Sequence, residues 1–488
     1  MNDMSQLSEL LSRLQDARVV CVGDLMLDRY VEGTVDRVSP EAPIPVLAEQ
    51  REIAMLGGVG NVLRNLTALG AACDLAAVIG IDRAGRELAK LVTREAKVTP
   101  RLLSIPGRQT SIKTRFVAGG QQLLRSDRET TEPISATEQA SMLEDARAAL
   151  QAAGNTVMVL SDYGKGVLEA PFLQDLIALA KDAGIPVIVD PKGQDFGRYR
   201  GVSMLTPNRQ ELAAATAMPT DSDENVIAAC RKLIADFDVA AILATRSERG
   251  MSLVTQDEAH HFPARAREVF DVSGAGDTVI AVLAAAMAAG ASAPEAAQLA
   301  NVAAGVVVGK VGTAVAHSNE ILAALHASEF MDAEAKVVAA ETLIDRAGTW
   351  RRQGWRVGFT NGCFDLLHPG HVSLLKQAKA TCDRLVVGLN SDASVRRLKG
   401  PDRPIQSEGS RSSVLASLAV VDLVVIFHEE TPLDLIDALR PDVLIKGSDY
   451  AVDEVVGAEQ MRSWGGEIVL ADILTGYSTT NTIQRMAK

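Results

Sequence analysis

The sequence has few cysteines, few aromatic residues and no long hydrophobic run. Its 488 residues include 5 cysteines, and aromatic residues make up 4% of the chain. The odd number and the scatter of the cysteines fit reduced thiols better than a disulfide framework. The longest apolar run, 279–289, is well short of the roughly 18 residues that would indicate a membrane span.

Basic residues are also in deficit. Lys and Arg number 49 against 62 Asp and Glu, which gives a net charge of -13. Such a field repels polyanions, so we expect neither a nucleic-acid nor a membrane partner, and any phosphorylated ligand must meet a local basic pocket. The first 16 residues carry acids and no hydrophobic stretch of signal-peptide type, and this predicts a cytoplasmic protein.

Short apolar runs alternate with helical patterns through the first part of the chain. The clearest buried strands are 157–160, 187–189 and 241–243, after a first strand at 19–22, and helical patterns span 141–150, 172–180 and 226–234. This alternation predicts an α/β fold with a mostly parallel sheet and helices on both faces. A glycine pair within 112–124 predicts a hairpin that forms a small β lid.

The first chemical motif is Gly274-Ala275-Gly276-Asp277, which opens onto an apolar helix. Free N–H groups at a helix N-terminus favour a phosphate in transfer, and a carboxylate beside them can take a proton from an attacking hydroxyl. Taken alone, the motif more often indicates a glycine loop that caps an Ala-rich helix, and it is the other motifs of the chain that favour the phosphate site.

Two further groups of polar residues accompany this motif. Gly57 and Gly58 allow close approach to a small polyol, while Asn61 and Asp28, expected on a loop, would hydrogen-bond its hydroxyls. A turn followed by a helix cap is the alternative. Asn208 and Glu211 follow a strand end, lie three apart at a helix start, and could orient hydrated Mg2+.

Together with the segment Thr245 to Gly250, these motifs resemble the ribokinase family of sugar kinases over roughly residues 10–325. The resemblance implies that Gly274, Ala275 and Gly276 form an anion hole and that Asp277 is the catalytic base. It further implies a sugar site at Asp28, Gly57, Gly58 and Asn61, and a Mg-ATP region at Asn208, Glu211, Thr245 and Gly250, with Glu211 serving the metal. Two departures are Ser247, where many members have glycine, and the tight spacing between Gly57 and Asn61.

A domain boundary is expected near residue 330, giving domains 1–330 and 331–488. The segment 318–336 is acidic and helical, helical spacing resumes over 337–352, and an apolar strand is expected at 355–360. The string that follows, from Thr360 to His371, places His368 and His371 on one side of a helix start. Paired imidazoles and helix N–H groups can stabilise a crowded α-phosphate, and half a zinc site is the alternative.

The string resembles the cytidylyltransferase-like nucleotidyltransferases over residues 340–488, which implies a Rossmann-like α/β domain. By this resemblance His368, His371 and Lys399 stabilise the transition state. The implied nucleotide-binding and substrate-side residues are Thr360, Phe364, Arg411, Ser478, Thr479 and Asp449. Ile473 stands where some relatives have an arginine, and Arg396, Arg397 and Arg403 are the nearby substitutes unless they form a solvated basic face. Cys363 is interpreted as a small filler.

A sugar kinase followed by such a transferase resembles the bifunctional heptose enzymes of Gram-negative bacteria. The family resemblance implies ATP-dependent phosphorylation of D-glycero-β-D-manno-heptose 7-phosphate at O1, then adenylyl transfer to heptose 1-phosphate, for lipopolysaccharide core. It implies ATP and Mg2+, sugar-phosphate substrates and a separate phosphatase, and we expect a homodimer. The alternatives are another sugar phosphate, or a regulatory nucleotide-binding protein with one degenerate half. The cations expected to hold the substrate's own phosphate are Lys113, Arg115, Arg125, Arg128, Lys165 and Lys192.

Overall fold

The computed structural model describes residues 3–151, 156–264, 269–310, 312–448 and 451–472. Contacts within the chain divide it into two compact units, the first ending at Leu325 and the second starting at His326. Helix α10 (Ser318–Glu334) spans this division, and the boundary expected near residue 330 falls inside the same helix.

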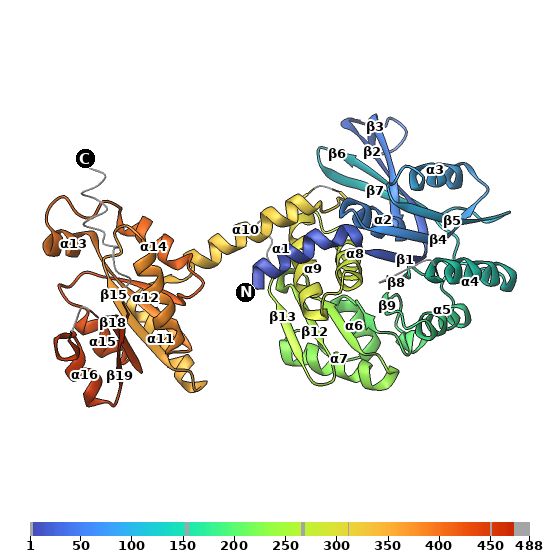
Figure 1. The fold of residues 1–488 in the computed structure, drawn as a ribbon. Coiled ribbons are helices and arrows are strands. Elements are labelled where there is room, and N and C mark those ends of the chain that lie inside the picture. The colour runs from blue at the N-terminus through green and yellow to red at the C-terminus, as the bar shows by residue number, and fades with distance from the viewer. Residues whose placement is uncertain (1–2, 152–155, 265–268, 311, 449–450, 473–488) are drawn as a thin grey trace. The chain divides into compact units, whose positions relative to one another are not determined.

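The first unit is built on a nine-stranded sheet in the order β13-β12-β11-β10-β9-β8-β1-β4-β5 (Figure 1). Its strands are β1 Arg18–Gly23, β4 Ala72–Gly80, β5 Val98–Ile105, β8 Thr156–Ser161, β9 Val187–Asp190, β10 Met204–Leu205, β11 Ala241–Thr245, β12 Met251–Val254 and β13 Ala259–Phe262. Every pairing from β11 to β5 is parallel, and only β12 and β13 are added antiparallel. The predicted mostly parallel sheet is confirmed.

Helices cover both faces of this sheet because its central strands are apolar on both sides. In β1, Val19 and Cys21 join one buried cluster, whereas Val20 and Val22 join the other. The first cluster includes helices α1 Asp3–Arg13, α2 Val59–Ala68, α3 Arg83–Val92, α8 Ala275–Ala288 and α9 Ala293–Val307, together with the start of α10. The second includes α4 Ala136–Gln151, α5 Ala170–Asp182, α6 Arg209–Thr216 and α7 Asp223–Phe237.

A separate four-stranded sheet forms the lid of the first unit, in the order β3-β2-β6-β7. Strands β6 (Ile112–Ala118) and β7 (Gln121–Arg128) pair antiparallel, so the predicted hairpin is confirmed. Strands β2 (Leu25–Val38) and β3 (Pro45–Gly58) were not predicted, because their outer halves are charged and exposed and lack an apolar period. The expectation that Asp28 lies on a loop is therefore wrong: Asp28 lies within β2.

The second unit contains a six-stranded, entirely parallel sheet in the order β14-β17-β16-β15-β18-β19. Its strands are β14 Val337–Val338, β15 Val357–Gly362, β16 Arg384–Asn390, β17 Leu423–Phe427, β18 Val443–Gly447 and β19 Glu467–Ala471. Its helices are α11 Ala340–Arg352, α12 Pro369–Ala380, α13 Asp392–Lys399, α14 Glu408–Ala416, α15 Leu433–Leu439 and α16 Ala458–Ser463. Helical spacing predicted from residue 337 was wrong for two residues, which pair as β14 with β17. Two apolar clusters, on either side of β16, complete the predicted α/β unit.

Candidate active sites

The glycine motif of the first unit forms the N-terminus of α8. Gly274 has a φ of 79° and caps the helix, and a Cβ there would lie 2.6 Å from Nδ2 of Asn61, so only glycine fits. Asp277 lies in the first helical turn and is buried. A carboxylate is thus held beside the positive end of a helix, where an anion is favoured.

The Asp277 carboxylate accepts one hydrogen bond on each oxygen. Asn61 Nδ2 donates to Oδ2 at 2.8 Å, and the Tyr163 hydroxyl donates to Oδ1 at 2.7 Å. Burial raises the pKa of Asp277 to about 6, while these two donors oppose the shift and the nearby charge of Asp28 adds to it. A pKa near the working pH suits a general base, because the group is mostly ionised yet still basic.

Asp28 lies beside this carboxylate, in the buried part of β2. Arg115 Nη1 donates to its Oδ1 at 2.9 Å, and a Cβ on Gly57 would come within 2.6 Å of its Oδ2. Gly58 has a φ of 61°, and a Cβ there would lie 2.3 Å from the Asp24 carbonyl oxygen. The fold therefore brings the predicted sugar-site residues together with the α8 motif.

Most cations proposed for the substrate's phosphate already have carboxylate partners. Arg115 pairs with Asp28, Arg125 with Asp127, Lys165 with Glu129 and Lys192 with Glu211. Among the described residues, no ion pair or hydrogen bond engages Lys113, whose ammonium lies 5.6 Å from the centroid of the Tyr163 ring. Burial lowers the pKa of Lys113, although the charges of Asp28 and Glu129 oppose this. Arg128 is exposed at the end of β7, so Lys113 is the half-buried candidate best able to accept an anionic ligand.

Asn208 and Glu211 form a capping box at the start of α6. The Asn208 side chain accepts from the N–H groups of Gln210 and Glu211, each at 2.9 Å, and Glu211 Oε2 accepts from the Asn208 N–H at 3.1 Å. Glu211 Oε1 lies 3.2 Å from Lys192 Nζ. Asn208 also bridges Thr245, at the end of β11, so these residues share the carboxyl edge of the sheet. Gly250, with a φ of 82°, packs against the Phe262 carbonyl nearby.

The carboxyl edge of the sheet also carries acidic side chains that could act on a divalent ion. Burial raises the pKa of Asp190, at the end of β9, well above its usual range, and the charges of Asp277 and Glu211 add to the shift. Over the part of the chain that the structure describes, no three His, Cys, Asp or Glu side chains are grouped to hold a metal. The carboxylates of Asp190 and Glu211 are oxygen donors, the ligand type that Mg2+ takes while it keeps several of its waters.

In the second unit the histidine motif forms the N-terminus of α12. His368 is the N-cap, its Nδ1 accepts from the His371 N–H at 3.4 Å, and the two rings stack at 3.8 Å with an interplanar angle of 17°. Phe364, buried and at a φ of 44°, packs on His371 at 5.1 Å. The stacked rings confirm the prediction that the two histidines lie on the same side of the helix start.

Burial favours the neutral form of both imidazoles. Burial, with the neighbouring His368, lowers the pKa of His371 to about 4, and burial lowers the pKa of His368. Oδ1 of Asn361 is buried and has no hydrogen-bond partner among the described residues. Neutral rings can donate hydrogen bonds to a phosphate without adding a full charge.

Arg411 is fully buried beneath the motif. Its guanidinium donates to the carbonyl oxygens of Cys363 at 2.6 Å and Asn390 at 2.9 Å, and it pairs with Asp392 Oδ1 at 2.7 Å. These contacts join the ends of β15 and β16 rather than present the guanidinium as a pocket wall. The expectation that Arg411 lines a pocket is not supported, because its guanidinium is buried and bonded to the backbone.

Asp365 is a buried residue that the sequence analysis did not single out. Its Oδ1 accepts from the N–H groups of Ile405 at 2.7 Å and Gln406 at 3.1 Å, and its Oδ2 pairs with Arg403. Because Arg403 pairs with Asp365 and holds the 403–406 turn, it is a poor substitute for the arginine that some relatives have at the position of Ile473. The sequence signal for this role was the position of Asp365 inside the motif, because a carboxylate that becomes buried needs hydrogen-bond partners.

The remaining candidates of the second unit surround the motif or lie outside the described residues. Thr360 is buried in β15, and Lys399 ends α13. Burial raises the pKa of the Cys363 thiol, and the charge of Lys399 opposes that shift, so Lys399 lies close to the motif. A thiol with a raised pKa is a poor nucleophile, as the filler interpretation expects. Asp449, Ser478 and Thr479, with Ile473, lie outside the described residues.

No helix among the described residues has both the length and the apolar character needed to cross a membrane.

Comparisons with known proteins divide the chain in the same order. Residues 16–320 match the pfkB family carbohydrate kinase model, and residues 359–485 match the cytidylyltransferase-like model. The chain is 59% identical over 490 residues to the bifunctional protein HldE of Paramagnetospirillum magneticum, covering 100% of this chain and 99% of that protein. It is 56% identical to the HldE of Rhodospirillum rubrum, covering 100% of this chain and 98% of that protein.

Solved structures share the fold of the first unit. Ribokinase of Arabidopsis thaliana, complexed with ribose and ATP, aligns with a TM-score of 0.51 at 23% identity, over 63% of this chain and 98% of its own. Phosphofructokinase-2 of Escherichia coli, in complex with substrates and products, aligns with a TM-score of 0.54 at 19% identity, over 64% of this chain and 99% of its own.

Proposed function

We propose that this chain, which belongs to the family of bifunctional HldE proteins, makes ADP-heptose with its two active sites. Its kinase and nucleotidyltransferase domains belong to families that use ATP. The first unit phosphorylates D-glycero-β-D-manno-heptose 7-phosphate at O1. The second joins the adenylyl group of ATP to heptose 1-phosphate and releases pyrophosphate. The product serves lipopolysaccharide core synthesis.

In the kinase step Asp277 is the general base. It takes the proton of the O1 hydroxyl, O1 bonds to the γ-phosphorus of ATP, and the bond from that phosphorus to the bridging oxygen of ADP breaks. The observation that carries this assignment is an ionisable carboxylate at the N-terminus of α8, with both oxygens fixed by donors. The N–H groups at Gly274, Ala275 and Gly276 would receive the transferred phosphate.

The sugar and the nucleotide lie on either side of this carboxylate. Asp28 and Asn61 would orient the sugar hydroxyls, with Gly57 and Gly58 giving them room. Asn208, Glu211, Thr245 and Gly250 would face the ATP phosphates. Mg2+ would be held through water by Glu211 and would neutralise phosphate charge when bound.

Lys113 is the proposed anchor for the 7-phosphate. It is half-buried beside Asp28 and Tyr163, whereas the four paired cations would each have to leave a carboxylate first. Lys113→Met should raise the KM for the phosphosugar at least tenfold, because charge-assisted contacts to phosphate are strong, and leave the KM for ATP nearly unchanged. Lys165→Met is the matched control at a paired lysine. Equal effects on both KM values in Lys113→Met would contradict the assignment.

In the transfer step an oxygen of the heptose 1-phosphate bonds to the α-phosphorus of ATP as the bond to pyrophosphate breaks. His368, His371 and Lys399 would stabilise the charge on that phosphorus group, the histidines as neutral donors. Thr360, Phe364 and Arg411 would shape the nucleotide pocket. Ser478, Thr479 and Asp449 keep the nucleotide and substrate roles that the family resemblance implies.

Two further parts of the proposal concern partners. A separate phosphatase must remove the 7-phosphate between the two steps, since neither proposed site hydrolyses a phosphate ester. A homodimer would pair two lids through the edge strand β7, where Leu123 and Leu124 are exposed. Light scattering of the purified protein would show a mass of two chains.

Product analysis with ATP, Mg2+ and a panel of sugar phosphates tests the whole proposal. Heptose 7-phosphate should give the 1,7-bisphosphate, and heptose 1-phosphate should give ADP-heptose and pyrophosphate. Turnover of hexose phosphates instead would favour a two-step activator of another sugar. Absence of ATP consumption by one unit would favour a regulatory protein with a degenerate half.

A further inference from the structure

Tyr163 touches the kinase carboxylate but belongs to no motif of the site. It follows β8, and its hydroxyl donates to Oδ1 of Asp277 at 2.7 Å, opposite the donor from Asn61 on Oδ2 at 2.8 Å. The three residues come from the first turn of α8, the first turn of α2 and the segment after β8. Two donors on opposite oxygens fix the rotation of a carboxylate and leave one lone pair on each oxygen available.

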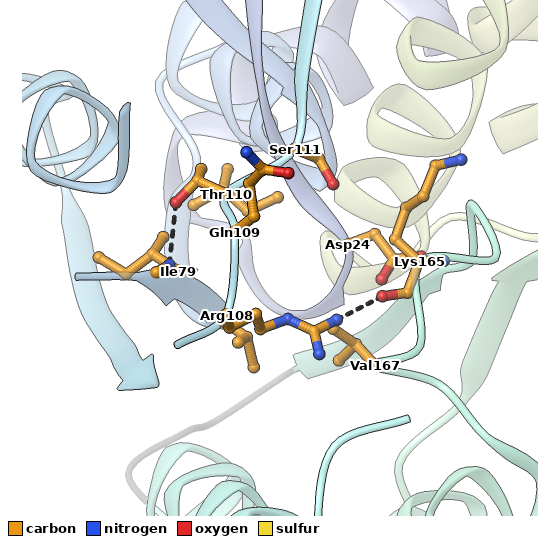
Figure 2. A pocket seen from close by; sticks show the side chains of 11 residues that line it. Asp24, Ile79, Arg108, Gln109, Thr110, Ser111, Lys165 and Val167 are labelled. Carbon is orange, nitrogen blue, oxygen red and sulfur yellow. Dashed lines mark hydrogen bonds between the residues drawn. The ribbon is translucent and has the colours of Figure 1, made fainter. Parts of the chain in front are cut away.

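The backbone that carries Tyr163 is itself clamped. Asp24 Oδ2 accepts from the N–H groups of Tyr163 at 2.8 Å and Lys165 at 3.0 Å. Arg108 Nη2 donates to the Lys165 carbonyl at 2.5 Å, a bond that Figure 2 shows next to the Asp24 carboxylate. Gly166 has a φ of 80°, and a Cβ there would lie 2.1 Å from the Glu132 carbonyl oxygen. The loop is therefore held on both sides, and the phenol is aimed rather than free to swing.

We propose that Tyr163 is a positioning residue for the kinase base, holding the Asp277 carboxylate oriented and ionised for the substrate hydroxyl. This inference rests on the proposed role of Asp277. Burial of its hydroxyl raises the pKa of Tyr163 well above its usual range, so the phenol remains a donor at every working pH. A permanent donor favours the charged form of Asp277 and opposes the effect of burial.

Other charged groups also face Asp277 and act on its pKa. Asp28 from β2 raises its pKa, Lys113 from β6 lowers it, and Asp190 at the end of β9 is electrostatically coupled to it. Asp24 has a pKa raised by burial to about 6 and acts on Tyr163 through the backbone. A test must therefore change the Tyr163 hydroxyl alone.

Tyr163→Phe removes that hydroxyl and keeps the ring beneath Lys113. In the full-length protein, the acid limb of the kinase kcat/KM profile should move up by about one pH unit, because a hydrogen bond to a charged group has been lost. kcat should fall while the KM for ATP holds. Tyr199→Phe is the matched control, since Tyr199 is buried and donates to Asp162 Oδ2 at 2.7 Å. An unmoved acid limb in Tyr163→Phe, or an equal shift in Tyr199→Phe, would overturn the inference.

A second pair of measurements guards against a merely structural effect. Replacing Tyr163 with 3-fluorotyrosine preserves its shape and strengthens the donor, so the acid limb should move down; movement up, or none, would contradict the proposal. In the Asp277→Asn background, Tyr163→Phe should cause no further loss of kcat, because a positioning residue acts only through the base. A full additional loss would overturn the inference. Near-normal activity of Asp277→Asn alone would instead overturn the proposed base.

Discussion

The two candidate sites are assembled in opposite ways. In the first unit, a single buried carboxylate receives donors from residues 216 and 114 positions away in the sequence. In the second, two imidazoles three residues apart stack at the start of one helix. Tertiary structure therefore makes the first site, whereas one short motif already brings together the central pair of the second.

The two sites also differ in how burial and hydrogen bonds set the protonation of their ionisable groups. Burial favours the neutral form of any ionisable group, which raises the pKa of a carboxyl and lowers that of an imidazole. Around Asp277, two donors oppose this effect and keep a charged base available near neutral pH. Around His371, burial and the neighbouring ring act together, and the imidazole remains neutral. The first site is suited to move a proton, and the second is suited to hold a charged phosphate.

The largest expected effect comes from removing the charge of the first site. Asp277→Asn should lower kinase turnover by roughly 10²- to 10⁴-fold, the usual contribution of a positioned base, with sugar and ATP affinity nearly intact. Steady-state kinetics with binding measurements on the same variant would check both parts. Adenylyl transfer by this variant is the internal control and should match the unmodified protein. A near-normal kinase rate would remove the contrast between the two sites.

The reciprocal change is His368→Ala. It should lower adenylyl transfer by roughly 10²- to 10³-fold through the loss of transition-state stabilisation, while kinase turnover stays within about twofold because independent sites in separate compact units seldom couple. Assays of each step with its own sugar phosphate measure the two rates separately. Kinase loss in His368→Ala would show that the sites depend on each other.

Separate chains covering 1–330 and 331–488 extend this test. Each has its own apolar clusters and motifs, so each should fold and retain one reaction. The first chain keeps Ile321 and Leu325 of α10, which are buried in its core. Insolubility of both chains would favour an obligatory fusion.

The sequence allowed prediction of what is local in each site. Alternating strands and helices predicted the main sheet of the first unit, and the glycine turn predicted the start of α8 with Asp277 in its first turn. The α/β fold of the second unit was implied by the family resemblance. The spacing of His368 and His371 was sufficient to predict their shared side. What could not be predicted depends on contacts between distant residues, such as the hydroxyl of Tyr163 on Asp277 or the burial of Arg411 under the motif. Asp28 was misplaced on a loop because β2 and β3 form a sheet whose outer halves are solvated.

A smaller effect should separate the sites by pH. With the pKa of Asp277 at about 6, the ionised fraction falls roughly tenfold between about pH 7 and about pH 5, and the kinase kcat/KM should fall with it. His371, with a pKa of about 4, stays largely neutral over that range, so it should contribute little to any change in transfer. Rates of the two steps measured across the same buffers test this. A common acid limb would indicate a titration shared by both steps rather than one in each site.

The two sites are also alike in one respect: each places a candidate ligand-binding residue at a helix N-cap, Asn208 at α6 and His368 at α12. The smallest expected effect tests this likeness. Asn208→Ala should lower the free energy of unfolding of the first unit by about 1 kcal/mol through loss of the cap. Ser222→Ala, at the N-cap of α7, is the matched control and should cost a similar amount. Chemical denaturation of the full-length protein measures both.

The two roles of Asn208 separate in the variant Asn208→Ser, because serine caps a helix about as well as asparagine but lacks its amide. If Asn208 serves only α6, Asn208→Ser should restore both the stability and the KM for ATP. If it also faces the Mg-ATP region, as proposed, stability should return while the KM for ATP stays severalfold above that of the unmodified protein and of Ser222→Ala. A KM that returns together with stability would confine Asn208 to its cap, and its likeness to His368 at the start of α12 would be lost.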